Sequence, residues 1–200
     1  MNSIYLLREV LEENNLSNEL LAVNKIKNWL MLNKKQIIMY ISAYIVAQVI
    51  TIVFMYSSFS FSEIISGSMR NTLQIGDTIF IDKLAYINKA PERGDIISFV
   101  MEEDKEYGYT KRIIGLPGER IWIYNGDVYV NEVKLEEDYI IPFNELIGPF
   151  VVPEGKYFVL GDNRPDSFDT RYSGWYVPID DIEGKVTFSF NLKEWRLSIF

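Results

Sequence analysis

An uncharged segment runs from Gln36 to Ser62 and is the longest apolar feature of the chain. Within it, residues 37–56 (IIMYISAYIVAQVITIVFMY) form a run of 20 residues. As a helix, this run would be about 30 Å long, which is the thickness of the hydrocarbon layer of a bilayer. A core helix of this length normally carries a polar stripe, and a cleaved signal peptide has a shorter apolar stretch with fewer residues before it. The pattern predicts a transmembrane helix over residues 36–58.

Apolar residues also recur at helical spacing before this segment. They predict an amphipathic helical segment over residues 1–35 that lies in the cytoplasm or at the membrane surface. Asparagine is a poor helix former, so we expect interruptions at Asn14, Asn15 and Asn18.

The charges that flank the apolar run predict its orientation. Four lysines precede the run, and only Glu63 and Arg70 follow it before Asp77; the lysines are Lys25, Lys27, Lys34 and Lys35. Cytoplasmic flanks carry the excess of Lys and Arg. We therefore expect a single-pass protein of the cell (plasma) membrane, with a cytoplasmic N-terminus and residues 59–200 outside the cytoplasm.

Beyond residue 66 the pattern changes to short, β-rich apolar runs at residues 77–84, 94–100, 109–115 and 156–162. Asn125-Gly126 stands between two alternating runs, which is a strong signal for a hairpin turn. Prolines and glycines predict a long connection from about 139 to 155. The exported part is predicted to be mainly β, a coiled antiparallel sheet domain that follows one N-terminal transmembrane helix.

The composition excludes several classes of protein and site. The chain carries 20 Lys and Arg against 28 Asp and Glu, a net charge of −8, which argues against a nucleic-acid partner. It contains no His, which excludes a Ser-His-Asp triad, and no Cys, which excludes thiol nucleophiles and disulfides. The acidic residues near 162–169 do not have the spacing of a calcium loop, so we expect no metal and no cofactor.

Ser68, in the stretch SGSMRNTL (66–73), has the small neighbours of a reactive serine, but a serine hydroxyl needs a base. In a strand, Tyr109 and Ile113 lie on the same face as Lys111. Apolar neighbours remove hydration from an ammonium and lower the pKa of a lysine, whereas an arginine stays charged. Lys111 is therefore the candidate base, although such a lysine can also extend its amine to water.

Four motifs together are more specific than these residues alone: SGSM (66–69), RGDIISF (93–99), KRIIGLPGE (111–119) and GDNRPDSFDTR (161–171). In this order they resemble the conserved motifs of the type I signal peptidases, the bacterial leader peptidases that use a Ser/Lys dyad. The resemblance covers residues 37 to about 190.

The resemblance implies a role for each matching residue. Ser68 would be the nucleophile and Lys111 the general base. Ser66 and the backbone N–H of Ser68 would form the oxyanion hole, and Ser167 would orient the Lys111 amine.

Other matching residues would support or line the site. Arg112 with Asp162, and Asp169 with Arg171, would form structural ion pairs. The walls of the substrate pocket would include Ile64, Met69, Tyr109 and Thr110. Two residues depart from the family pattern: Asn71 replaces a usual proline and is expected to loosen the turn, and Thr170 replaces a common serine.

The function implied is cleavage of N-terminal signal peptides from exported pre-proteins, after Ala-X-Ala-like sites. Small apolar pockets would reject large side chains by steric clash. The partners would be secretory signal peptides and the lipid bilayer, with the secretion translocase as a candidate. Phe59, Phe61, Phe143 and Phe150 would either enter the membrane interface or belong to the core.

Two other functions fit some of these observations. A self-cleaving repressor of the SOS type shares the dyad, but it would need a DNA-binding head in place of the membrane helix. A catalytically degenerate paralogue that acts as a membrane-tethered binding module remains open. An assay of turnover distinguishes it from an enzyme.

Overall fold

The computed structural model describes residues 2–101 and 104–200. The chain divides into two compact units, Met1–Phe54 and Met55–Phe200. The first unit belongs to one long helix, and the second unit contains all the described strands.

Helix α1 (Asn2–Ser58) is continuous. The predicted interruption at Asn14, Asn15 and Asn18 is therefore wrong. Asparagine costs a helix less than about 1 kcal/mol per residue, which good helix formers beside it offset. Because α1 also runs through residue 36, the predicted division between residues 1–35 and 36–58 rests on the sequence alone.

Within the described residues, Leu20–Ser58 of α1 is long and apolar enough to cross a membrane, by length and composition. None of its most apolar part is buried, unlike the core helix of a soluble protein. This helix is a candidate membrane anchor.

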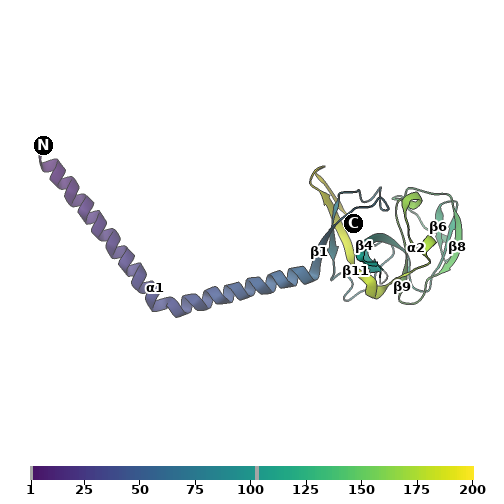
Figure 1. Cartoon of the computed structure of the whole chain (residues 1–200), viewed down its shortest axis with the longest axis horizontal. Helices are drawn as coiled ribbons and strands as arrows, with labels where there is room; N and C mark the ends of the chain where they lie inside the picture. The colour runs from purple at the N-terminus through teal and green to yellow at the C-terminus, as the bar shows by residue number, and fades with distance from the viewer. Residues whose placement is uncertain (1, 102–103) are drawn as a thin grey trace. The chain divides into compact units, whose positions relative to one another are not determined.

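The second unit is built from antiparallel strands in two sheets, which confirms the mainly β prediction. The larger sheet has the order β1-β2-β11-β3-β4-β9-β10, with β12 paired to β11, and the smaller has the order β7-β6-β5-β8. Strand β1 lies at one end of this unit, and β6 and β8 lie at the other (Figure 1). The strands are β1 (Phe59–Glu63), β2 (Thr78–Asp82), β3 (Ile96–Met101), β4 (Asp104–Gly115), β5 (Arg120–Tyr124), β6 (Asp127–Val130), β7 (Val133–Lys134), β8 (Leu146–Val151), β9 (Lys156–Leu160), β10 (Val177–Pro178), β11 (Ile182–Asn191) and β12 (Arg196–Ile199). Short helical turns are η1 (Arg164–Asp166), α2 (Thr170–Ser173) and η2 (Ile179–Asp181).

The predicted hairpin is present, because β5 and β6 pair around Asn125 and Gly126. Both residues have positive φ, 50° and 85°, as a two-residue hairpin turn of this kind requires. The predicted connection over 139–155 is only partly right, since it contains β8 as an edge strand of the smaller sheet. Pro149 is tolerated there because an edge strand does not need every N–H for pairing.

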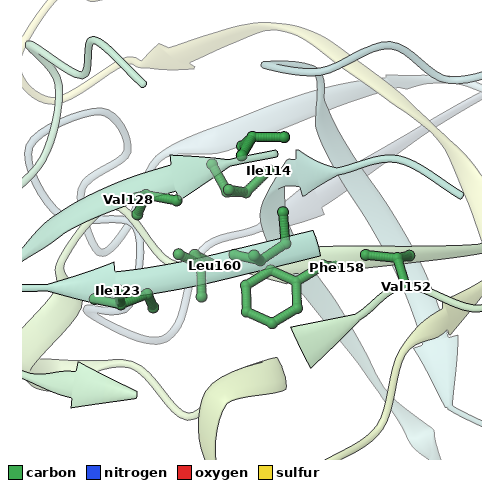
Figure 2. Close-up of a cluster of buried hydrophobic side chains, with 8 residues drawn as sticks. Ile114, Ile123, Val128, Val152, Phe158 and Leu160 are labelled. Atoms are coloured by element: carbon green, nitrogen blue, oxygen red, sulfur yellow. The ribbon is translucent and has the colours of Figure 1, made fainter. Parts of the chain in front are cut away.

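A buried apolar cluster joins the two sheets (Figure 2). Ile114, Phe158 and Leu160 come from the larger sheet, and Ile123 and Val128 come from the smaller. Two further clusters lie within the larger sheet, one around Met69 and Leu73 and the other around Ile97 and Ile113. The loop after β1 and the middle of β4 are thereby anchored in apolar packing.

Four phenylalanines were expected either at the membrane interface or in the core, and they differ in how far the structure buries them. Phe150 packs against the cluster of Figure 2, with its ring 4.9 Å from that of Phe158. Phe61 is 62% exposed and Phe143 is 44% exposed, while Phe59 is half-buried and stacks on Phe80. Phe150 is therefore a core residue.

Candidate active site

Ser68 lies in the turn between β1 and β2 and is 8% exposed. Backbone hydrogen bonds close this turn, from Arg70 N to Gly67 O at 3.0 Å and from Leu73 N to Met69 O at 2.8 Å. Because Met69 and Leu73 are buried in the core, the serine between them and β1 has a fixed position.

Asn71 shapes the same turn. Its φ is 94°, which proline, fixed near −65°, cannot adopt. Its side-chain Nδ2 donates to the backbone oxygen of Tyr139 at 2.8 Å. The asparagine therefore ties the turn to another segment, and the expected loosening stays a prediction.

Lys111 extends from β4 to Ser68. Its Nζ donates to Ser68 Oγ at 2.6 Å and to the backbone oxygen of Thr110 at 3.2 Å. Ser68 and Lys111 are 43 positions apart in sequence, and both are buried. This contact has the geometry of a nucleophile beside its base.

Burial lowers the pKa of Lys111 from 10.5 to about 8, while Asp169 and Asp162 act in the opposite direction because their charges favour the ammonium. Loss of hydration is the largest of these effects. A lysine with this pKa is neutral in a substantial fraction of molecules near pH 8, so it can accept a proton.

Ser66 lies beside the nucleophile, with its Oγ 3.4 Å from Ser68 Oγ. A hydroxyl at this distance can turn toward an oxygen that develops negative charge near Ser68. Its role in an oxyanion hole stays a prediction.

Ser167 lines a pocket together with Ser68 and Lys111, and it contacts Asp169. Ser167 Oγ donates to Asp169 Oδ2 at 2.7 Å, and Arg171 donates to both carboxylate oxygens at 2.8 and 3.0 Å. Since Ser167 gives its proton to Asp169, its lone pairs remain to accept from Lys111. The orienting role of Ser167 stays a prediction.

The second implied ion pair is also present. Arg112 donates to both oxygens of Asp162, at 2.9 and 2.7 Å, and its guanidinium lies 4.0 Å from the centre of the Tyr139 ring. Thr72 Oγ1 donates to the same carboxylate at 2.5 Å. The pair therefore connects β4 to the end of the nucleophile turn. Thr170, the other departure from the family pattern, accepts the Val159 N–H at 3.1 Å and so supports β9.

Two residues that contact the backbone around Ser68 were not predicted from the sequence. Asn163 donates to Ser68 O from its backbone N at 3.0 Å and to Gly67 O from Nδ2 at 2.9 Å. Gly161 packs so closely that a Cβ there would overlap Ser167 Oγ and Ser68 O. Both belong to the GDNRPDSFDTR motif, but nothing in the motif says which backbone they contact.

Replacing Gly161 with alanine should therefore damage the site even though the added group is one methyl. The methyl must displace either the Ser68 backbone or Ser167, and small shifts at a reacting centre can cost about a hundredfold in rate. We expect kcat/KM for a peptide substrate to fall at least roughly a hundredfold. Activity within twofold of the unaltered protein would contradict this packing argument.

A pocket of about 240 Å³ opens beside the dyad. All four predicted wall residues line it, namely Ile64, Met69, Tyr109 and Thr110. Ser98, Tyr107 and Glu183 also line it, although they were not among the predicted wall residues. A second, more open pocket of about 470 Å³ touches Ser66, Ser68, Lys111, Ser167 and Phe168. Among the side chains that the structure describes, no group of three or more acidic residues could hold a metal.

A buried serine in contact with a buried lysine of lowered pKa, on a mainly β scaffold, is the arrangement expected of a Ser/Lys dyad. Residues 37–191 match the family described as signal peptidase, peptidase S26. This match covers more than half of the chain, and the chain belongs to that family.

Individual relatives agree with this family. The chain is 41% identical over 131 residues to "Probable signal peptidase I-2" of Synechocystis, over 62% of this chain and 60% of the relative. It is 39% identical over 133 residues to "Signal peptidase I" of Leptolyngbya laminosa, over 62% of this chain and 65% of the relative. The matched region thus spans less than two thirds of either relative. A crystal structure of a signal peptidase I from Enterococcus faecalis is 40% identical and covers 50% of this chain and 98% of that chain, with a TM-score of 0.43.

Proposed function

We propose that this protein is a membrane-anchored serine endopeptidase that cleaves N-terminal signal peptides from exported pre-proteins. The observation that carries the proposal is the 2.6 Å contact between Lys111 Nζ and Ser68 Oγ, beside a pocket lined by the expected wall residues. Family membership supports the same activity.

In the proposed mechanism, neutral Lys111 takes the proton of Ser68 as Oγ attacks the scissile carbonyl carbon. The negative charge that develops on the carbonyl oxygen is stabilised by the Ser66 hydroxyl and the backbone N–H of Ser68. Lys111 then gives its proton to the leaving amine. In the second half of the reaction it removes a proton from the water that hydrolyses the acyl-enzyme.

The substrate pocket supports a preference for small side chains before the cut. Ile64 and Met69 are buried, so the pocket wall next to Ser68 cannot move aside easily. A peptide with alanine at the first and third positions before the cut fits this pocket, and a large side chain would clash.

The test is a mass-spectrometric assay of the detergent-solubilised full chain with a peptide that ends its signal in Ala-X-Ala. We expect one cut, directly after the second alanine. A properly folded protein that leaves this peptide intact would favour the alternative, a degenerate paralogue that binds at the membrane without turnover.

The topology belongs to the same proposal and rests on the four lysines before the apolar run. Protease added to right-side-out spheroplasts should digest residues 66–200 and spare residues 1–35, because the positive flank stays in the cytoplasm. Fragments are identified with antibodies against each end. Loss of the N-terminal epitope while the C-terminal one survives would reverse the orientation and contradict this localisation.

A further inference from the structure

Apolar walls were expected for the pocket beside Ser68 and Lys111, but one part of its lining, here called the polar floor, consists of polar side chains. Polar side chains on three adjacent strands line one part of the pocket, namely Thr110 on β4, Ser98 on β3 and Glu183 on β11. Ser98 lies directly opposite Thr110 in the pairing of β3 with β4, so the two side chains are neighbours on one face of the sheet.

A register shift in β11 brings Glu183 into this row. Ser98 pairs with Gly184 and Phe99 pairs with Ile182, so Glu183 is the extra residue between two regular pairs. Such irregularities redirect a side chain. Here Ser98 Oγ donates to Glu183 Oε2 at 2.8 Å.

Toward a substrate side chain, Ser98 and Glu183 can mainly accept further hydrogen bonds. Ser98 is 3% exposed and has given its only side-chain proton to Glu183. Its lone pairs and the carboxylate oxygens of Glu183 can only accept. An apolar substrate side chain would remove water from these acceptors without replacing its hydrogen bonds.

Under the proposed function, this row is the part of the pocket that takes the third residue before the cut, because it lines the same pocket as Ser68. The first residue must place its carbonyl at Ser68, and side chains of an extended peptide that share a face are about 7 Å apart. Adjacent strands are about 4.8 Å apart, so Ser98 and Glu183 lie one and two strand spacings beyond Thr110. The first residue meets Ile64 and Met69, and the third residue reaches the polar floor.

We propose that Glu183, held by Ser98, makes this protein prefer a hydrogen-bond-donating side chain, serine or threonine, at the third residue before the cut. The inference rests on the proposed function for its position along the substrate. Threonine and valine have nearly the same shape, so the comparison of these two isolates the hydroxyl.

The experiment compares three peptides with alanine, threonine or valine at this position. We expect kcat/KM for threonine to exceed that for valine roughly tenfold, less than in a fully closed site because Glu183 is exposed to solvent. Glu183→Leu should bring the ratio to one or below, whereas Glu183→Gln, which keeps an acceptor oxygen, should retain most of it. Glu154→Leu removes an exposed acid outside the pocket and is the matched control.

Binding of the same peptides to the full-length Ser68→Ala protein, measured by calorimetry, separates this inference from the proposed function. If no peptide is cut but threonine still binds more tightly than valine, the proposed function is wrong and the preference stands. A threonine to valine ratio of one or less in the unaltered protein would overturn the preference. So would a ratio that Glu183→Leu leaves unchanged.

Discussion

Lys111→Arg will abolish cleavage while the protein stays folded. Arginine keeps the positive charge but its guanidinium does not give up a proton in this pH range, so Ser68 loses its base. Ser68→Ala and Lys111→Ala remove the nucleophile and the base outright. For all three variants we expect kcat to fall at least roughly a thousandfold, as when one member of a catalytic unit is lost.

The measurement is a single-turnover assay of the solubilised full chain, with circular dichroism to check folding. Lys193→Arg, at an exposed position on the same unit, is the matched control and should keep full activity. Appreciable cleavage by folded Lys111→Arg would eliminate Lys111 as the base.

Activity should rise with pH and level off above about pH 8. The free protein must hold Lys111 neutral to work, and burial lowers the pKa of this lysine to about 8. Between pH 6 and pH 8 the neutral fraction grows roughly fiftyfold, and kcat/KM should follow it. A series of initial rates across this range measures the pKa directly. An acid optimum near pH 4 would contradict a lysine base.

The same series with Ser167→Ala examines the orienting hydroxyl. This change leaves the charge of the site intact and removes a hydroxyl that donates to Asp169 and lines the same pocket as Ser68 and Lys111. We expect kcat to fall roughly tenfold or more and KM to change much less, because the base is disturbed and peptide binding is not. A rate equal to that of the unaltered protein would show that Lys111 is positioned without Ser167.

The contact between Ser68 and Lys111 could be predicted because its signals are local or compositional. The absence of His leaves few bases for Ser68, and strand alternation puts apolar neighbours beside Lys111. The hairpin at Asn125 could also be predicted, because this type of turn requires positive φ at both of its residues.

The remaining features depend on contacts between distant segments. Ser98 and Glu183 are 85 positions apart and meet through a register shift that no periodicity reveals. From the sequence, Asn163 is an ordinary turn residue. Only the structure shows that it donates hydrogen bonds to the backbone of Gly67 and Ser68. Strand β8 was missed because the proline and glycines near it indicate a loop, and only pairing with β5 makes it a strand.

The buried position of Lys111 also links catalysis to the stability of the fold. In the unfolded chain this lysine regains its ordinary pKa near 10.5, against about 8 in the folded protein. Between these values the unfolded chain binds more protons, so the free energy of unfolding increases as the pH rises, by up to roughly 3 kcal/mol. Burial also raises the pKa of Tyr86 and Tyr139 in the folded protein. Above about pH 10 the folded protein therefore holds protons that the unfolded chain loses, and the free energy of unfolding decreases as the pH rises. In the proposed mechanism, the loss of one proton from the Lys111 amine thus makes the protein both competent for catalysis and more resistant to unfolding, so mildly alkaline solution should favour both properties together.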